Sequence, residues 1–297
     1  MMWNHQLTLG TIVLAGIFSA VSVQAQVVWS GAGDGSTWGD DNNWTGGQEP
    51  ALGDNVDLAG ASVVVDTNDA AYANFENNGG SVTVNAGGIL TTNGTFAAVR
   101  YIAGMTVNNG GALLNPAGTA WLRSTTVVNS GGLVQGFATL RDNDLTLSGG
   151  TFAPRDSVNG NNDFSFGTTA ADFYLDTGTL QLDLFGDGVN EYWVVGNTSS
   201  DLWLDTGTVE LVPQGGYVPA SGDSFQIFDN TAASTDILFQ ADAANVVIQG
   251  FKTVTWDTSQ WDLTDGTLTV ETLVVPEPAT LGVFALGLLC LARRRRA

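Results

Sequence analysis

The sequence predicts an all-β protein whose main body is a β-solenoid, a stack of coils of the parallel β-helix type. Glycine accounts for 38 of the 297 residues and proline for only 7. Val and Thr alternate in short runs separated by Gly, Asn and Asp, and no long run has the 3.6-residue period of a helix. A short segment also recurs at a nearly constant spacing, which is typical of repeat architectures.

The recurring segment contains a Gly-Gly pair preceded by asparagine. Thr-Val-Asn-Ala-Gly-Gly-Ile-Leu at 83–90 recurs in related form at 106–113 and 127–134, and shortened at 146–150, with the Gly-Gly pairs 23, 21 and 18 residues apart. Glycine suits a tight corner because such corners need positive φ, and Asn tolerates the same region. Equivalent asparagines could also stack as a side-chain ladder along this corner.

The pattern changes after residue 160. An Asp-Thr-Gly-Thr segment at 176–179 recurs at 205–208, and Asp-Gly-Thr at 265–267 is a weaker echo. These strand signals predict a β-rich C-terminal section, and either further coils or a small sandwich would fit them.

The N-terminus predicts an export signal. Residues 1–25 contain no Asp, Glu, Lys or Arg, and an apolar stretch runs from Leu7 to Val23. Small residues at Val23 and Ala25 predict cleavage between Ala25 and Gln26 by signal peptidase, after passage through the Sec translocon. A membrane-spanning anchor is the alternative, but a polar Gly- and Asp-rich segment follows at once.

The C-terminus has three parts in a fixed order: Pro276, Glu277 and Pro278, then an apolar run, then Arg293, Arg294, Arg295 and Arg296. The arginine cluster predicts a cytoplasmic stop signal by the positive-inside rule. The 14 residues 279–292 would form a transmembrane helix of about 21 Å. That is short for a hydrocarbon core of about 30 Å, and snorkelling arginines could accommodate the difference. A buried C-terminal helix is the alternative, but a soluble core does not need four terminal arginines.

This tail resembles the PEP-CTERM sorting domain of Gram-negative bacteria. The resemblance implies export, transient anchoring in the inner membrane and processing near the Pro-Glu-Pro motif by an exosortase. It also implies a final location at the cell surface or in an extracellular polysaccharide matrix of the biofilm type, which makes exopolysaccharide a candidate partner.

The body resembles bacterial surface proteins with autotransporter-associated β-strand repeats. The N-terminal motifs are Val28-Trp29-Ser30-Gly31, the tryptophans at 38 and 44, and Glu49-Pro50; the stretch 193–229 is similar to the last repeats of that family. This resemblance implies a secreted solenoid without an assigned molecular activity.

Together these features predict five segments. They are a signal peptide at 1–25, a Trp-rich capping segment at 26–76, solenoid repeats at 77–160, C-terminal coils or a sandwich at 161–272, and a sorting tail at 273–297.

Composition excludes several kinds of chemistry. The chain has 30 acidic and 9 basic residues, a net charge of −21, and a single histidine and cysteine, His5 and Cys290. Cleavage of the signal peptide and the sorting tail would remove both the histidine and the cysteine. The remaining body, residues 26–275, has 29 acidic and 5 basic residues and a net charge of −24. The body then lacks the side chains for a Ser-His-Asp triad, a cysteine nucleophile, a His/Cys zinc site or a disulfide. Its charge argues against nucleic-acid binding. We expect no cofactor.

The basic residues of the body are unevenly placed. Residues 77–141 contain no acidic residue, and Arg100, Arg123 and Arg141 occupy one repeat position there. Stacked coils would bring equivalent residues to about 4.7–4.9 Å spacing. These three residues, called the arginine row below, could bind anionic groups of an acidic polysaccharide. Alternatively, acidic neighbours such as Asp142 or Asp144 pair with the arginines.

Three further features have a functional and a structural interpretation. Trp29, Trp38 and Trp44 could stack on sugar rings or could cap the open end of the solenoid. The loops 40–43 and 187–191 contain oxygen ligands for calcium, but match no calcium motif and also suit turns. We therefore predict no metal site.

An enzyme would have to use carboxylates, with Asp142, Asp144 and Asp156 the first candidates for a polysaccharide hydrolase or lyase. The sequence favours instead a non-catalytic exported surface or matrix protein.

Overall fold

The structure is a computed structural model that describes residues 26–51, 54–66, 70–72, 74–75, 80–92, 99–100, 102–116, 120–154, 164–166, 171–190, 193–194, 202–229, 245–259 and 266–274. The predicted signal helix and transmembrane helix lie outside these residues. The described part consists mainly of β-strands, with the short 3₁₀ helix η1 (Asp41–Asn43) near its start, and contains no α-helix.

Most strands belong to three parallel sheets, named here sheets I, II and III. Sheet I has the order β1 (Gln26–Val28), β2 (Asn55–Asp57), β5 (Asn74–Phe75), β8 (Val99–Arg100), β11 (Ala120–Arg123), β14 (Phe137–Leu140), β17 (Phe164–Phe166), β21 (Trp193–Val194) and β25 (Phe228–Asp229). Sheet II has the order β3 (Ser62–Val65), β6 (Ser81–Val84), β9 (Gly104–Val107), β12 (Thr126–Asn129), β15 (Leu145–Ser148), β18 (Phe173–Leu175) and β22 (Leu202–Leu204). Sheet III has the order β4 (Ala70–Tyr72), β7 (Ile89–Thr91), β10 (Ala112–Leu114), β13 (Leu133–Gln135), β16 (Thr151–Ala153), β19 (Thr179–Gly186), β23 (Thr208–Pro213) and β26 (Val246–Ile248), with β20 (Val189–Asn190) paired antiparallel to β19.

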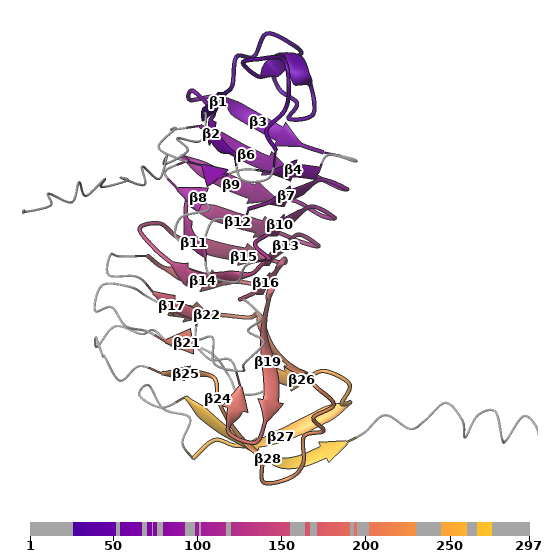
Figure 1. Cartoon of the computed structure of the whole chain (residues 1–297). Helices are drawn as coiled ribbons and strands as arrows, with labels where there is room; N and C mark the ends of the chain where they lie inside the picture. The colour runs from indigo at the N-terminus through magenta and orange to yellow at the C-terminus, as the bar shows by residue number, and fades with distance from the viewer. Residues whose placement is uncertain are drawn as a thin grey trace, which may run out of the picture.

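The chain visits sheets I, II and III in the same order from β2 to β23, apart from the short β20. One such passage is called a coil below. Successive coils lie one above the other from the N-terminal to the C-terminal end (Figure 1). This is the β-helix-like, all-β architecture that the repeats predict. Parallel pairing continues through β23 to β26, beyond residue 161.

The core consists of inward-facing rows that run along the stack. One row of sheet III joins buried residues of consecutive coils in register: Leu90, Leu113, Val134, Phe152, Leu180, Val209 and Val246. Strand residues alternate between this core and the outer surface, as the period-2 pattern predicts. Fully burying each such side chain contributes about 1.5–3 kcal/mol.

The repeated Gly-Gly pair forms the corner between sheets II and III. The first glycine has positive φ in each case, +76° at Gly110 for example. The second glycine is needed for a different reason: a Cβ atom on Gly111 would lie 2.6 Å from the Val84 carbonyl oxygen of the preceding coil. The corner therefore excludes side chains because neighbouring coils stack with their backbones in close contact.

The predicted asparagine ladder is present beside this corner. The side-chain amide of Asn108 donates to Oδ1 of Asn85 at 2.8 Å, and the side-chain amide of Asn129 donates to Oδ1 of Asn108 at 2.7 Å. The asparagines of three consecutive coils thus bond in series, and the ladder ends at Ser148, which pairs with Asn129 in the next coil.

The two ends of the stack differ from its middle. At the N-terminal end, residues 36–38 pair with β3, the edge strand of sheet II, through Trp38 N to Val64 O at 2.8 Å and Val64 N to Ser36 O at 2.9 Å. The 3₁₀ helix η1 (Asp41–Asn43) lies in this covering segment. At the other end, β24 (Ser224–Gln226), β28 (Thr267–Val274) and β27 (Thr253–Asp257) form a small antiparallel sheet.

Candidate functional site

The arginines predicted to share one repeat position come from adjacent coils of sheet I. Arg123 pairs in register with Arg100 at the ends of β11 and β8. The backbone N–H of Arg141, just after β14, donates to the Leu122 carbonyl oxygen at 3.0 Å. The side chain of Arg100 lies outside the described part, whereas those of Arg123 and Arg141 are described.

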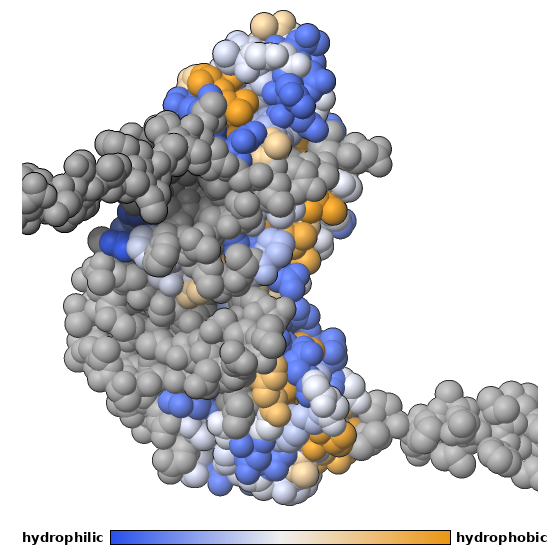
Figure 2. All heavy atoms as spheres, viewed as in Figure 1, coloured by the Kyte–Doolittle hydropathy of each residue, from blue (hydrophilic) through white to orange (hydrophobic). Residues whose placement is uncertain are grey.

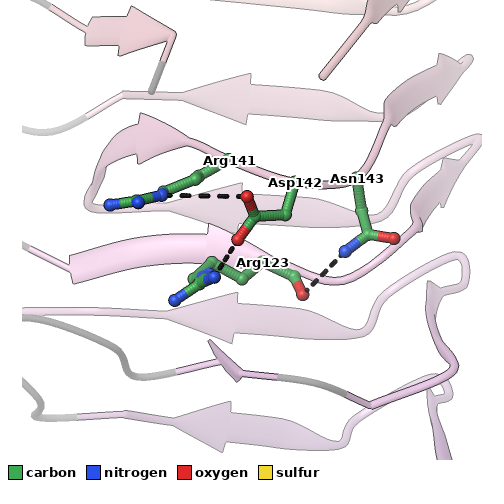
Figure 3. A network of polar contacts seen from close by, with 4 residues as sticks. All are labelled: Arg123, Arg141, Asp142 and Asn143. Carbon is green, nitrogen blue, oxygen red and sulfur yellow. Dashed lines mark hydrogen bonds and ion pairs between the residues drawn. The ribbon is translucent and has the colours of Figure 1, made fainter. Parts of the chain in front are cut away.

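Arg123 and Arg141 converge on one carboxylate (Figure 3). Arg123 forms an ion pair with Asp142, and Nε of Arg141 lies 3.8 Å from Oδ1 of the same aspartate. The side chains of Arg123, Arg141 and Asp142 are 8%, 26% and 20% exposed. Because removing a charge from water is costly unless it is paired, the nearly buried Arg123 needs this partner.

Trp121 and Asn143 make further contacts with the two arginines. The guanidinium carbon of Arg141 lies 4.7 Å from the ring centroid of Trp121, a cation–π distance, and that of Arg123 lies 5.9 Å from it. The side chain of Asn143 donates to the Arg123 carbonyl oxygen at 3.1 Å. Asp142 therefore pairs with the arginines, which is the structural alternative to anion binding that the sequence suggests. Anion binding by the row stays a prediction.

The three N-terminal tryptophans are buried. Trp29, Trp38 and Trp44 are 6%, 0% and 2% exposed. Trp44 packs edge-on against the other two, with centroids 4.8 and 4.7 Å away, and its indole N–H donates to the Trp38 carbonyl oxygen at 2.8 Å. Rings in this position cap the core and do not present a face to a sugar.

The acidic N-terminal loop is a hydrogen-bond network around Asn43, which is fully buried. Its side-chain oxygen accepts from Gly33 N at 3.0 Å and Gly35 N at 2.9 Å, and its amide donates to Asp34 at 2.7 Å. Hydrogen bonds from Thr37, Ser36 and Asn43 hold the pKa of Asp34 well below its usual range.

The two loops considered for calcium also use carboxylates to accept backbone hydrogen bonds. Asp40 accepts the backbone N–H groups of Asp34 and Asn42, which lower its pKa, and Asp187 accepts that of Ser224 at 2.8 Å. Within the described ranges, no group of three or more His, Cys, Asp or Glu residues could hold a metal ion.

The carboxylates considered for catalysis also have structural contacts. Asp142 pairs with the arginines, and Asp144 Oδ1 accepts the backbone N–H of Asp172 at 3.0 Å. Asp156 lies outside the described residues.

One surface feature was not predicted from the sequence. The outer face of sheet III contains a cavity of about 350 Å³, lined by Gln135, Gln181, Gln214, Gln249, Asp183 and Phe185 among others. It is called the glutamine groove below. Alternating outward positions at 181, 183 and 185 were a visible signal, and the recurrence of 176–179 at 205–208 indicates how these residues align with the next coil. Their grouping into a groove also depends on the lengths of β16, β19 and β23, which the recurrence does not give.

The predicted signal cleavage and sorting residues lie mostly outside the described part. Gln26, the residue that cleavage after Ala25 would leave first, begins β1 and pairs with Asn55. Pro276, Glu277, Pro278 and the four terminal arginines fall beyond the last described residue. In the part of the chain that the structure describes, no helix is long and apolar enough to span a bilayer.

Comparison with known proteins identifies the tail. Residues 274–296 match the family model of the PEP-CTERM protein-sorting motif. Searches of curated proteins and of solved structures give no match. The chain thus has a sorting signal for export from a Gram-negative cell. This signal indicates anchoring of the C-terminus in the membrane, followed by processing by an exosortase.

Proposed function

We propose that this chain is a non-catalytic β-solenoid that is displayed at the cell surface or retained in the extracellular polysaccharide matrix. The observation that carries the proposal is the match of residues 274–296 to the PEP-CTERM protein-sorting motif. Sec-dependent export and signal-peptidase cleavage after Ala25 belong to the same proposal, as does the likeness to autotransporter-associated repeats.

The described side chains support a structural role. The asparagine ladder, the Asp142 pairing and the Asn43 network each connect neighbouring parts of the stack. The body from 26 to 275 contains no cysteine, so stacking must supply the stability that disulfides give many secreted proteins. Capping at the N-terminal end also protects an edge strand from pairing with another chain.

Fractionation of the producing cells with intact-mass measurement tests the proposal. We expect the surface or medium fraction to contain a chain that starts at Gln26 and lacks the arginine cluster. In a strain without the exosortase, the tail should persist and the chain should stay in the inner membrane. An intact tail on the extracellular protein would refute sorting, and sugar release from a polysaccharide by the purified protein would refute the non-catalytic assignment.

Binding of acidic polysaccharide through Arg100, Arg123 and Arg141 is the second candidate function, since Arg141 is partly exposed. Its test is binding of an oligogalacturonate by Arg100→Ala/Arg141→Ala and by the native chain. Equal binding by both would exclude the row as the site.

A further inference from the structure

The glutamine groove results from a change in strand length. β16 is three residues long and is followed by Pro154, whereas β19 has eight residues and β23 has six. The longer strands continue past the end of β16 and form a wall beside it. Figure 2 shows that the outline of the molecule is hollowed on one side, at the level where Figure 1 labels β16 and β19.

The wall presents pairs of amides and carboxylates. The Gln181 amide donates to Glu210 at 2.7 Å, directly across β19 and β23, and the Gln214 amide donates to Asp183 at 2.7 Å. A glutamine amide has two N–H donors and a carbonyl acceptor, and a carboxylate has several acceptor sites. These pairs hold the side chains in fixed positions and place donors and acceptors close together.

The groove also has apolar surface. Phe185 follows Gln181 and Asp183 on the same face of β19, and its side chain is half-buried. Val212 and Ala153 line the cavity with it. An aromatic ring beside fixed hydrogen-bonding groups suits a ligand with both hydroxyl groups and C–H faces.

Charge selects among such ligands. The groove includes Asp183, the adjoining wall has Glu210, and the body as a whole carries −24. An anionic ligand would be repelled there, whereas sugar hydroxyls can donate to carboxylates and accept from amides. The volume of about 350 Å³ falls near the lower end of the range of about 300–1,000 Å³ for small-molecule sites.

The geometry points to the glutamine groove as a binding site for a neutral oligosaccharide segment, with Asp183 and Gln214 bonding to hydroxyls and Phe185 packing on a sugar ring. This site is separate from the arginine row, and it would bind a neutral ligand, whereas the row would bind an acidic polysaccharide. It goes beyond display at the surface, because it gives the exported protein a ligand of its own.

Titration calorimetry on the mature exported protein tests the site. The probes are neutral tetrasaccharides of glucose, galactose, mannose and N-acetylglucosamine, with tetragalacturonate as the acidic comparison. We expect at least one neutral probe to bind. Phe185→Ala and Asp183→Asn should each weaken that binding at least about tenfold, which corresponds to about 1.4 kcal/mol.

Two more variants separate binding from folding. Ala153→Trp fills the groove from its outer face without removing a buried group, and it should abolish binding. Asp205→Asn changes the same charge on an exposed turn of the next coil, and it should bind as the native chain does. All four variants should still reach the cell surface, so this readout distinguishes failure of the site from failure of sorting.

Three results would overturn the inference. They are absence of binding by all neutral probes, binding that survives both Ala153→Trp and Phe185→Ala, and preferential binding of tetragalacturonate.

Discussion

The asparagine ladder allows a quantitative test of how the stack is stabilised. Asn108 is in the middle of the ladder, where it donates to Asn85 at 2.8 Å and accepts from Asn129 at 2.7 Å. Asn108→Ala removes both hydrogen bonds, while Asn85→Ala removes one of them. The two variants should therefore differ in a predictable ratio.

The expected magnitude follows from the number of bonds. One hydrogen bond contributes about 0.5–1.5 kcal/mol net, so Asn85→Ala should lower the free energy of unfolding by about 1 kcal/mol and Asn108→Ala by about 2 kcal/mol. For a domain of this size, about 1 kcal/mol lowers the melting temperature by about 2–4 °C. We expect Asn108→Ala to melt about 4–8 °C below the native protein.

Urea unfolding followed by circular dichroism measures these differences. Asn109→Ala is the matched control, because Asn109 is the next residue and its side chain is exposed. The m-value should be equal in all variants, which shows that the same surface unfolds. If Asn108→Ala is no more destabilising than Asn109→Ala or Asn85→Ala, the ladder does not stabilise the stack as described.

Three further predictions concern other contacts. Gly111→Ala should lower the free energy of unfolding by about 1–3 kcal/mol, because the new Cβ would lie 2.6 Å from the Val84 carbonyl oxygen; urea titration measures this. Asp142→Asn should cost about 2–4 kcal/mol in the same assay, because it leaves Arg123 nearly buried without its charged partner. The lowered pKa of Asp34 means that its stabilising contribution is complete above the unfolded pKa of about 3.9 and is lost as the pH falls further. The urea midpoint of the native protein should therefore drop more steeply below pH 4 than that of Asp34→Asn.

Controls for these variants come from matched positions. A Cβ on Gly104 would have its nearest neighbour at 3.9 Å, so Gly104→Ala should be well tolerated. Asp205→Asn removes an exposed carboxylate and should have little effect on stability. Equal losses in Gly104→Ala and Gly111→Ala would contradict the close backbone contact, and equal losses in Asp205→Asn and Asp142→Asn would contradict the role of the buried pair. A parallel acid response of Asp34→Asn and the native protein would exclude Asp34 as its cause.

The corner of the coil was predictable in part. Positive φ at the first glycine of each pair was expected from turn chemistry, and Gly110 confirms it. The role of Gly111 was not expected, because a clash with the preceding coil depends on how closely two coils stack. A local pattern indicates the conformation of a turn but not the distance to a segment more than 20 residues away.

The candidate sites were also predictable only in part from the sequence. The sequence placed Arg123 and Arg141 at one repeat position and suggested Asp142 as a partner, and the ion pairs are present. The glutamine groove was not predicted. The recurrence of 176–179 at 205–208 does align Gln181 with Glu210. It does not show that β19 and β23 extend past the end of β16, or that Gln214 bonds diagonally to Asp183. The repeat spacing that predicts the earlier coils does not extend to these longer ones.

The sequence by itself determined the sorting signal, the all-β class and the order of the repeats. Sorting signals are short linear motifs, and alternation with turn residues is a local property, so neither needs a folded partner to be recognised. The tertiary structure decided the burial of the tryptophans, the extent to which Asp142 neutralises the arginines, and the existence of the groove. Each of these depends on the alignment of neighbouring coils, and that alignment is set by packing across the whole stack.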